Sequence, residues 1–172
     1  SLNFNAADTT FNMLGDNAAL PADQQIVAND LIAVYNLGIT GSDAYLGDNT
    51  SAVTGVSLAL NPAPGVEYKI DIASKKFPLE SGSNRFHVIP NNEKIAAYIC
   101  DGSGNLLRNA NQSYGSPCTT AGATVMASKL SACSFVYNSA DQRNALVQLG
   151  ITFTEKGESV NLYHEVHVNN TP

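Results

Sequence analysis

The chain has 172 residues, a formal net charge of −6 at neutral pH and only nine lysines and arginines. A chain of this length is expected to form a single domain, residues 1–172, that buries most of its apolar surface. The basic residues are scattered singly apart from Lys75-Lys76, so no basic stripe exists to neutralise phosphates. Nucleic acid is therefore excluded as the main partner.

Membrane and export signals are missing from the sequence as it stands. It holds no apolar run near 18 residues, and it begins at Ser1 without a signal peptide. We interpret the chain as a trimmed piece whose exporting or anchoring segment lies upstream.

One helix is expected, over residues 21–29 (PADQQIVAN), because Pro21 stands in its first turn with Asp23 close behind. Everything after it reads as strands and turns. Strands are expected at residues 30–37, 52–60, 68–72, 85–89, 94–100, 105–109 and 133–137. Turn residues between the segments of 85–109 favour a meander of antiparallel hairpins.

The chain closes with a predicted hairpin. Residues 146–154 and 159–168 alternate apolar and polar side chains, which is typical of half-buried strands. Lys156-Gly157 lies between them as a turn. The fold class predicted from these elements is α+β and β-rich, with an antiparallel sheet.

Two of the three histidines, His164 and His167, flank Glu165 in the last predicted strand. A zinc-protease motif places its two histidines four apart on a helix, so that both face one metal. Here the spacing is three, and on a strand the two side chains point to opposite faces. We therefore predict no metal site, a core-facing His164 with one hydrogen-bond partner and a surface His167.

A second candidate for a metal site is the run Asp43, Asp48 and Asn49, whose oxygens could surround calcium. The spacing matches no EF-hand loop. Asp and Asn side chains commonly bond their own backbone in turns, and this role is favoured. Calcium binding remains the alternative.

Catalytic signatures are not found. The sequence contains neither Ser-x-x-Lys nor Gly-x-Ser-x-Gly. Gly102-Ser103-Gly104 lacks the third glycine and the following helix of a phosphate-binding loop, so a hairpin turn is favoured. We expect a protein that is not an enzyme and that uses no cofactor.

The three cysteines, Cys100, Cys118 and Cys133, lack the spacing of zinc or redox sites. The favoured arrangement is a Cys118–Cys133 disulfide, because it would close a Gly/Ser/Thr-rich loop and stabilise it by about 3 kcal/mol. Cys100 would then be left over, its partner lost upstream. Three reduced thiols are the alternative.

Several blocks of the sequence together resemble a known family. They are QIVANDLIAVYNLGITGSDAYLGDN at 25–49, FPLESGSNRFHVIP at 77–90 with KIAAYIC following, LSACSFVY at 130–137 and LYHEVHVNN at 162–170. Over nearly its whole length the chain is similar to the soluble part of minor pilins of the mannose-sensitive haemagglutinin (MSHA) type IV pilus of Gram-negative bacteria.

This resemblance implies a pilin/pseudopilin-like head whose N-terminal apolar helix is missing from the chain. It implies a role in priming pilus assembly and in attachment at the filament tip, through contacts with other minor pilins and the major pilin. The head would face the periplasm from the inner membrane and reach the cell surface after assembly. The isolated fragment is expected to be monomeric.

Two alternatives to a minor pilin stay open. A type II secretion pseudopilin shares the pilin architecture. A secreted adhesin or carbohydrate-binding β-module would belong to a different class and would act alone.

Overall fold

The computed structural model describes residues 2–60, 66–110, 112, 116–138 and 144–169. Strands account for about half of the described residues. The strands are β1 (Asp8–Leu14), β2 (Leu31–Ala33), β3 (Thr50–Leu58), β4 (Glu67–Lys75), β5 (His87–Ile89), β6 (Ala97–Cys100), β7 (Leu106–Asn109), β8 (Thr124–Ala127), β9 (Leu130–Asn138), β10 (Asn144–Glu155) and β11 (Glu158–Asn169). Two short 3₁₀ turns, η1 (Asn17–Ala19) and η2 (Asn91–Glu93), are the helical elements of the described residues.

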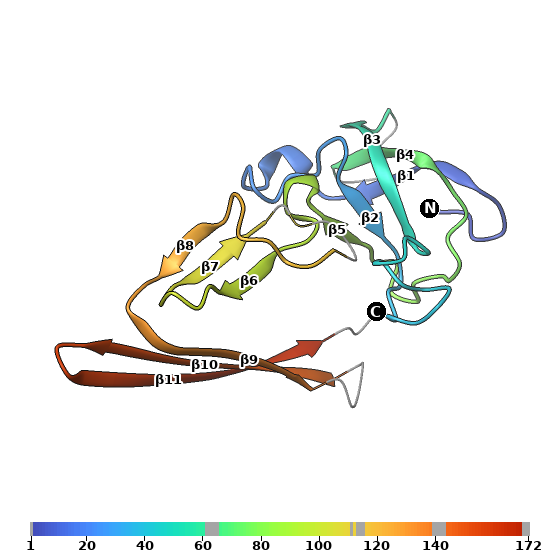
Figure 1. The fold of residues 1–172 in the computed structure, drawn as a ribbon. Helices are drawn as coiled ribbons and strands as arrows, with labels where there is room; N and C mark the ends of the chain where they lie inside the picture. Colours follow the sequence, from blue (N-terminus) through green and yellow to red (C-terminus); the bar gives the residue numbers. More distant parts are fainter. Residues whose placement is uncertain (1, 61–65, 111, 113–115, 139–143, 170–172) are drawn as a thin grey trace. The chain divides into compact units, whose positions relative to one another are not determined.

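The predicted α+β, pilin-like fold class is therefore wrong. The described chain is nearly all β and forms three antiparallel sheets (Figure 1).

The helix expected over residues 21–29 is absent for a local reason. A first turn does form, because the backbone N–H of Gln25 donates to the carbonyl of Pro21 at 3.1 Å. The next two N–H groups are then captured by side chains: Ile26 donates to Asn17 Oδ1 and Val27 to Asp30 Oδ2, both at 2.9 Å. Side-chain acceptors of this kind compete with the helical ladder, and here they end it after one turn.

The described chain divides into two compact units, unit 1 with residues 1–91 and unit 2 with residues 92–171. Each unit has its own group of buried apolar side chains. The two are described separately below. That residues 1–172 form one domain stays a prediction.

Unit 1 is built on a five-stranded sheet in the order β1-β4-β3-β2-β5. Its core contains Phe77, Ile32 and Ile70, each with 0% exposed side chain. Phe11 of β1 meets Phe86, just before β5, edge to face with ring centroids 5.1 Å apart. Since β1 and β5 are the two outer strands, the sheet curls until side chains from its opposite edges touch.

Asp30 fixes the place of β5 in that sheet. Its carboxylate is buried and accepts from the N–H of Val27 at 2.9 Å and from the N–H of Asn91 at 2.9 Å. Asn91 immediately follows β5 and its connecting Pro90, and β5 pairs with β2 directly after Asp30. The meander predicted from residue 85 onward is thus wrong in its first step, because β5 pairs with β2 and not with β6.

Unit 2 contains two three-stranded sheets, β6-β7-β8 and β9-β10-β11. The hairpin predicted for residues 146–154 and 159–168 is confirmed as β10 and β11, paired without a register shift from Asn144↔Asn169 to Glu155↔Glu158. Lys156 and Gly157 link them with φ of 52° and 85°. Two residues at positive φ match the right-handed twist of a hairpin. Figure 1 shows the two strands lying side by side along their length.

Candidate functional site

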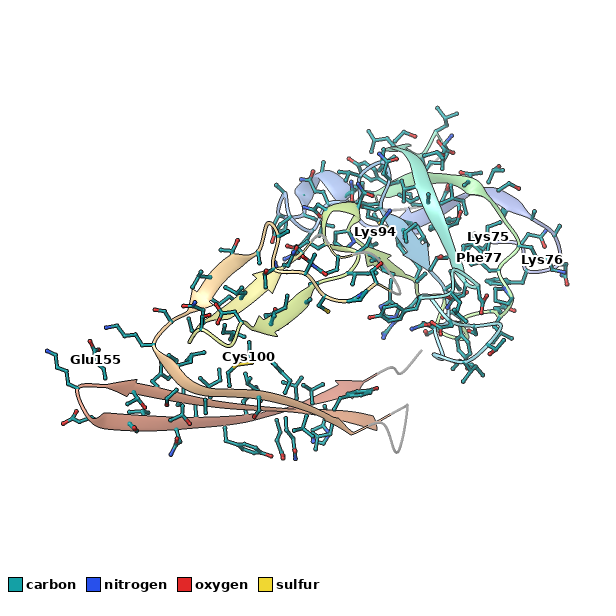
Figure 2. The ribbon with its side chains drawn as sticks, in the orientation of Figure 1. Lys75, Lys76, Phe77, Lys94, Cys100 and Glu155 are labelled. Atoms are coloured by element: carbon teal, nitrogen blue, oxygen red, sulfur yellow. A yellow bond between two sulfur atoms is a disulfide. The ribbon has the colours of Figure 1, made fainter. Side chains whose placement is uncertain are left out.

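The cysteines join the two sheets of unit 2. Cys100, the last residue of β6, forms a disulfide with Cys133 of β9, with a Cα–Cα distance of 5.8 Å (Figure 2). Cys118 is free and exposed. A disulfide was correctly expected, but the predicted Cys118–Cys133 pairing is wrong. The composition of the loop before Cys133 favoured Cys118 as its partner. The observed pairing instead depends on how the β6-β7-β8 and β9-β10-β11 sheets pack.

The histidines lie on opposite faces of β11, as predicted. His164 pairs with Leu149 of β10 and His167 pairs with Leu146, so the two histidines are three positions apart along the strand, and an odd offset places their side chains on opposite faces. His164 does share the apolar face, yet it is exposed, so its predicted burial is wrong. Within the described ranges, no group of three or more His, Cys, Asp or Glu side chains is placed to hold a metal ion; the absence of a metal site stays a prediction.

The Asp43–Asn49 segment has the hydrogen bonds of turns. Asp43 Oδ1 accepts from the N–H of Tyr45 at 2.8 Å, and Asp48 Oδ2 accepts from the N–H of Gly41 at 2.7 Å. Asn49 is fully buried and its Nδ2 donates to the carbonyl of Val34 at 3.0 Å. The two aspartate contacts agree with the favoured turn role, whereas Asn49 bonds a distant carbonyl and its buried Oδ1 has no hydrogen-bond partner among the described residues. Calcium binding by this segment stays an untested alternative.

One face of the β9-β10-β11 sheet carries its polar side chains. Cross-strand bonds join Thr152 to Asn161 at 2.7 Å and Gln148 to Glu165 at 3.0 Å. Tyr163 also donates to Glu165, and this bond lowers the pKa of the Glu165 carboxyl while it raises the pKa of the Tyr163 hydroxyl. Such cross-strand pairs stabilise the register of the sheet.

The other face of the same sheet is apolar. Its middle packs against the β6-β7-β8 sheet, where Ile151 and Leu130 join Leu106 in a buried cluster. On β11 and near the C-terminal end of β9, the apolar side chains are not covered by another sheet and are between 39% and 60% exposed. We call these residues the apolar face; they are Phe135, Tyr137, Val160, Leu162 and Val166.

An apolar face of this kind is uncommon on a protein that acts alone. Isolated exposed apolar residues are normal, but contiguous ones on one face of a sheet mark sites of interaction. Of the β11 residues whose side chains the structure describes, none belongs to the buried cluster of unit 2, although Leu162 lies directly opposite the buried Ile151. The alternation of residues 159–168 predicted the face correctly; that it would stay uncovered was not visible in the sequence.

Unit 1 contains a cavity of about 780 Å³ between β1, β4 and the segment before β5. Phe4, Phe11, Phe86 and Met13 give it aromatic and apolar walls. The polar lining residues are Asn12, Glu67, Glu80, Ser81, Asn84, Arg85 and His87. Sequence reasoning missed this site, because its residues come from four segments of the chain that only the fold of unit 1 brings together.

The polar side of the cavity is partly fixed by internal bonds. Glu67 is buried and accepts from Asn12 Nδ2 at 3.0 Å. The Oγ of the buried Ser81 accepts from the N–H of Arg85 at 3.1 Å, which holds the backbone of the cavity wall. Glu80 and Arg85 make no ion pair with one another or with any other described residue.

In comparisons with known proteins, no family model, no curated protein and no solved structure matches the chain. Among the described residues, no helix has the length and apolar character needed to cross a membrane. The two candidate functional features of the molecule are thus the apolar face of unit 2 and the cavity of unit 1.

Proposed function

We propose that this chain acts by protein–protein contact as a subunit of a cell-surface assembly, and that its apolar face is the contact surface. The assembly proposed is a type IV pilus of the MSHA kind, in which the chain serves as a minor pilin that primes filament formation. The observation that carries the proposal is the uncovered apolar face opposite the polar, hydrogen-bonded face of the same sheet. The resemblance of several sequence blocks to minor pilins suggests the kind of partner.

The physical argument concerns affinity. A face of five partly exposed apolar side chains offers a small contact, weaker than the interfaces of stable complexes. Such contacts become effective when both partners are tethered to one membrane, because tethering gives effective concentrations that reach the millimolar range. We therefore propose other minor pilins, the major pilin and the inner membrane, through an upstream helix, as its partners.

The test is complementation of a strain that lacks the full-length gene. Deletion should reduce surface pili, and the wild-type gene should restore them. Leu162→Glu should fail to restore them, because it places a charge in the apolar face. Ser159→Glu is the matched control, since it puts the same residue on the same strand but on the polar face. Both positions are exposed, so neither change should cost more than about 0.5 kcal/mol of folding stability.

Three results would contradict the proposal. Equal restoration by both variants would show that the apolar face has no role. Loss of protein secretion with intact pili would favour the type II secretion pseudopilin. Restoration of pili by the head alone, exported with an ordinary signal peptide, would contradict tethered assembly.

A secreted adhesin or carbohydrate-binding module is the second candidate, and the cavity of unit 1 favours it. Such a module would act without a membrane tether. Export of the head alone with an ordinary signal peptide therefore separates the two candidates, because only the secreted module should function in that form.

A further inference from the structure

The cavity of unit 1 has the size and lining of a ligand site. Its volume of about 780 Å³ falls in the range of roughly 300–1,000 Å³ that is typical of small-molecule pockets. Such pockets combine mostly apolar walls with a few polar groups that orient the ligand. Here Phe4, Phe11 and Phe86 form the apolar part, and charged side chains stand on the polar side.

The charges around the cavity restrict the ligand. Arg85 is the cation of the lining, and Glu67 and Glu80 are its carboxylates. A simple anion would meet Arg85 but also both carboxylates, and a simple cation would meet the carboxylates but also Arg85. A zwitterion with separated charges can pair with Arg85 and with Glu80 at once, and neither side chain is occupied by an ion pair of the described protein.

The uncharged polar groups point to the same chemistry. The side-chain amide of Asn84 lines the cavity and makes no hydrogen bond with the described residues. Together with Asn12 it offers donors and acceptors to a peptide group. The volume exceeds what one amino acid needs, which leaves room for a second apolar side chain against the phenylalanines.

We propose that the cavity of unit 1 binds short apolar peptides with free termini, the carboxylate on Arg85 and the ammonium group beside Glu80. This site is separate from the apolar face of unit 2 and does not depend on the function proposed above.

The experiment uses the full chain and the dipeptide Leu-Phe as the probe. Binding is followed through the ¹H–¹⁵N signals of the protein, with N-acetyl-Leu-Phe and Leu-Phe amide as matched probes that lack one charge each. Leu-Phe should shift the signals of Phe86 and His87 and bind about tenfold more tightly than either blocked form, because each removes a charge-assisted contact.

Variants then test whether Arg85 binds the peptide carboxylate. Arg85→Gln should weaken Leu-Phe binding about tenfold and remove its advantage over the amide. Lys76→Gln, an exposed cation of unit 1 outside the cavity lining, should leave binding unchanged. Because Arg85 is exposed and its structural bond uses the backbone N–H, the Gln variant should fold normally.

Several outcomes would overturn the proposal. They are the absence of Leu-Phe binding at millimolar concentration, equal binding of the free and blocked peptides, shifts confined to unit 2, and an Arg85→Gln variant that binds as tightly as the wild type.

Discussion

At the residue scale, short polar side chains decide where backbone groups bond. Pro21 and Asp23 carry valid helix signals, and one helical turn does form. The helix stops because the next two backbone N–H groups donate to side chains instead of to helical carbonyls. These side chains are Asn17, before the segment, and Asp30, after it. Local propensity was predictable from the sequence, but the capture of these groups depends on how the loop folds back.

Asp30 should therefore be a main stabiliser of unit 1. Asp30→Ala removes the acceptors of two backbone N–H groups, those of Val27 and Asn91, at a buried position. Because an unsatisfied buried donor costs about 1–3 kcal/mol, we expect a loss of about 2–4 kcal/mol in urea-induced unfolding. Asp23→Ala, at an exposed position without such bonds, should stay within about 0.5 kcal/mol of the wild type. Equal stabilities would contradict the role assigned to Asp30.

Acidic groups of unit 2 should make its stability depend on pH. The guanidinium of Arg108 bonds both oxygens of Glu93, at 3.1 and 2.8 Å, and lowers the pKa of that carboxyl. Bonds from Asn105 lower the pKa of Asp101 in the same way. A carboxyl with a lowered folded-state pKa stabilises the fold above its unfolded value of about 4, and the contribution is lost as the pH falls through the folded value.

The measurement is the melting temperature of the protein between pH 7 and pH 2. Glu93→Gln should flatten the acid side of this profile, because one linked proton is removed. Glu158→Gln, whose carboxylate has no such partner among the described residues, should keep the wild-type slope. An unchanged profile for Glu93→Gln would show that the pair does not persist in solution.

At the scale of elements, local pairings were predictable and distant ones were not. The β10–β11 hairpin follows from a period of two and a turn at Lys156-Gly157. The pairing of β5 with β2 and that of β1 with β4 join segments far apart in the sequence, and no local pattern encodes them. The disulfide between Cys100 and Cys133 likewise joins residues far apart in the sequence, so it was not predictable from a local pattern.

The two residues of one cross-strand pair should differ sharply in how much each contributes to folding stability. Ile151 and Leu162 lie opposite one another on the apolar side of the sheet, with 8% and 53% of their side chains exposed. Ile151→Ala should cost about 2–4 kcal/mol, because it leaves a cavity in the buried cluster. Leu162→Ala should cost well under 1 kcal/mol. Equal costs, measured by urea unfolding, would show that the face at Leu162 is covered in the folded protein.

At the scale of the whole molecule, the two units differ in how they are held together. Among the described residues, the core cluster of unit 1 contains eight buried apolar residues and that of unit 2 contains three. A small core needs another source of stability, and in unit 2 this is the Cys100–Cys133 disulfide. Closing a chain segment of 33 residues stabilises by about 4 kcal/mol in the chain-entropy model.

Reduction should consequently unfold unit 2 and leave unit 1 folded, because all three cysteines lie in unit 2. With a thiol reductant, the ¹H–¹⁵N signals of residues 92–171 should collapse into the unfolded range, while those of residues 2–91 keep their positions. Cys100→Ser should reproduce this result without reductant, and Cys118→Ser should not. Simultaneous loss of both sets of signals would contradict the independence of the two cores.

The most direct test of the central claim asks what the apolar face touches in the cell. A photo-crosslinking residue, p-benzoylphenylalanine, replaces Leu162 on the apolar face or Ser159 on the polar face of β11 in the full-length protein. After illumination of piliated cells, the proposed function predicts crosslinks from position 162 to pilin subunits and none from position 159. Crosslinks of equal yield from both positions, or none from position 162, would contradict the account that this face joins the chain to its assembly.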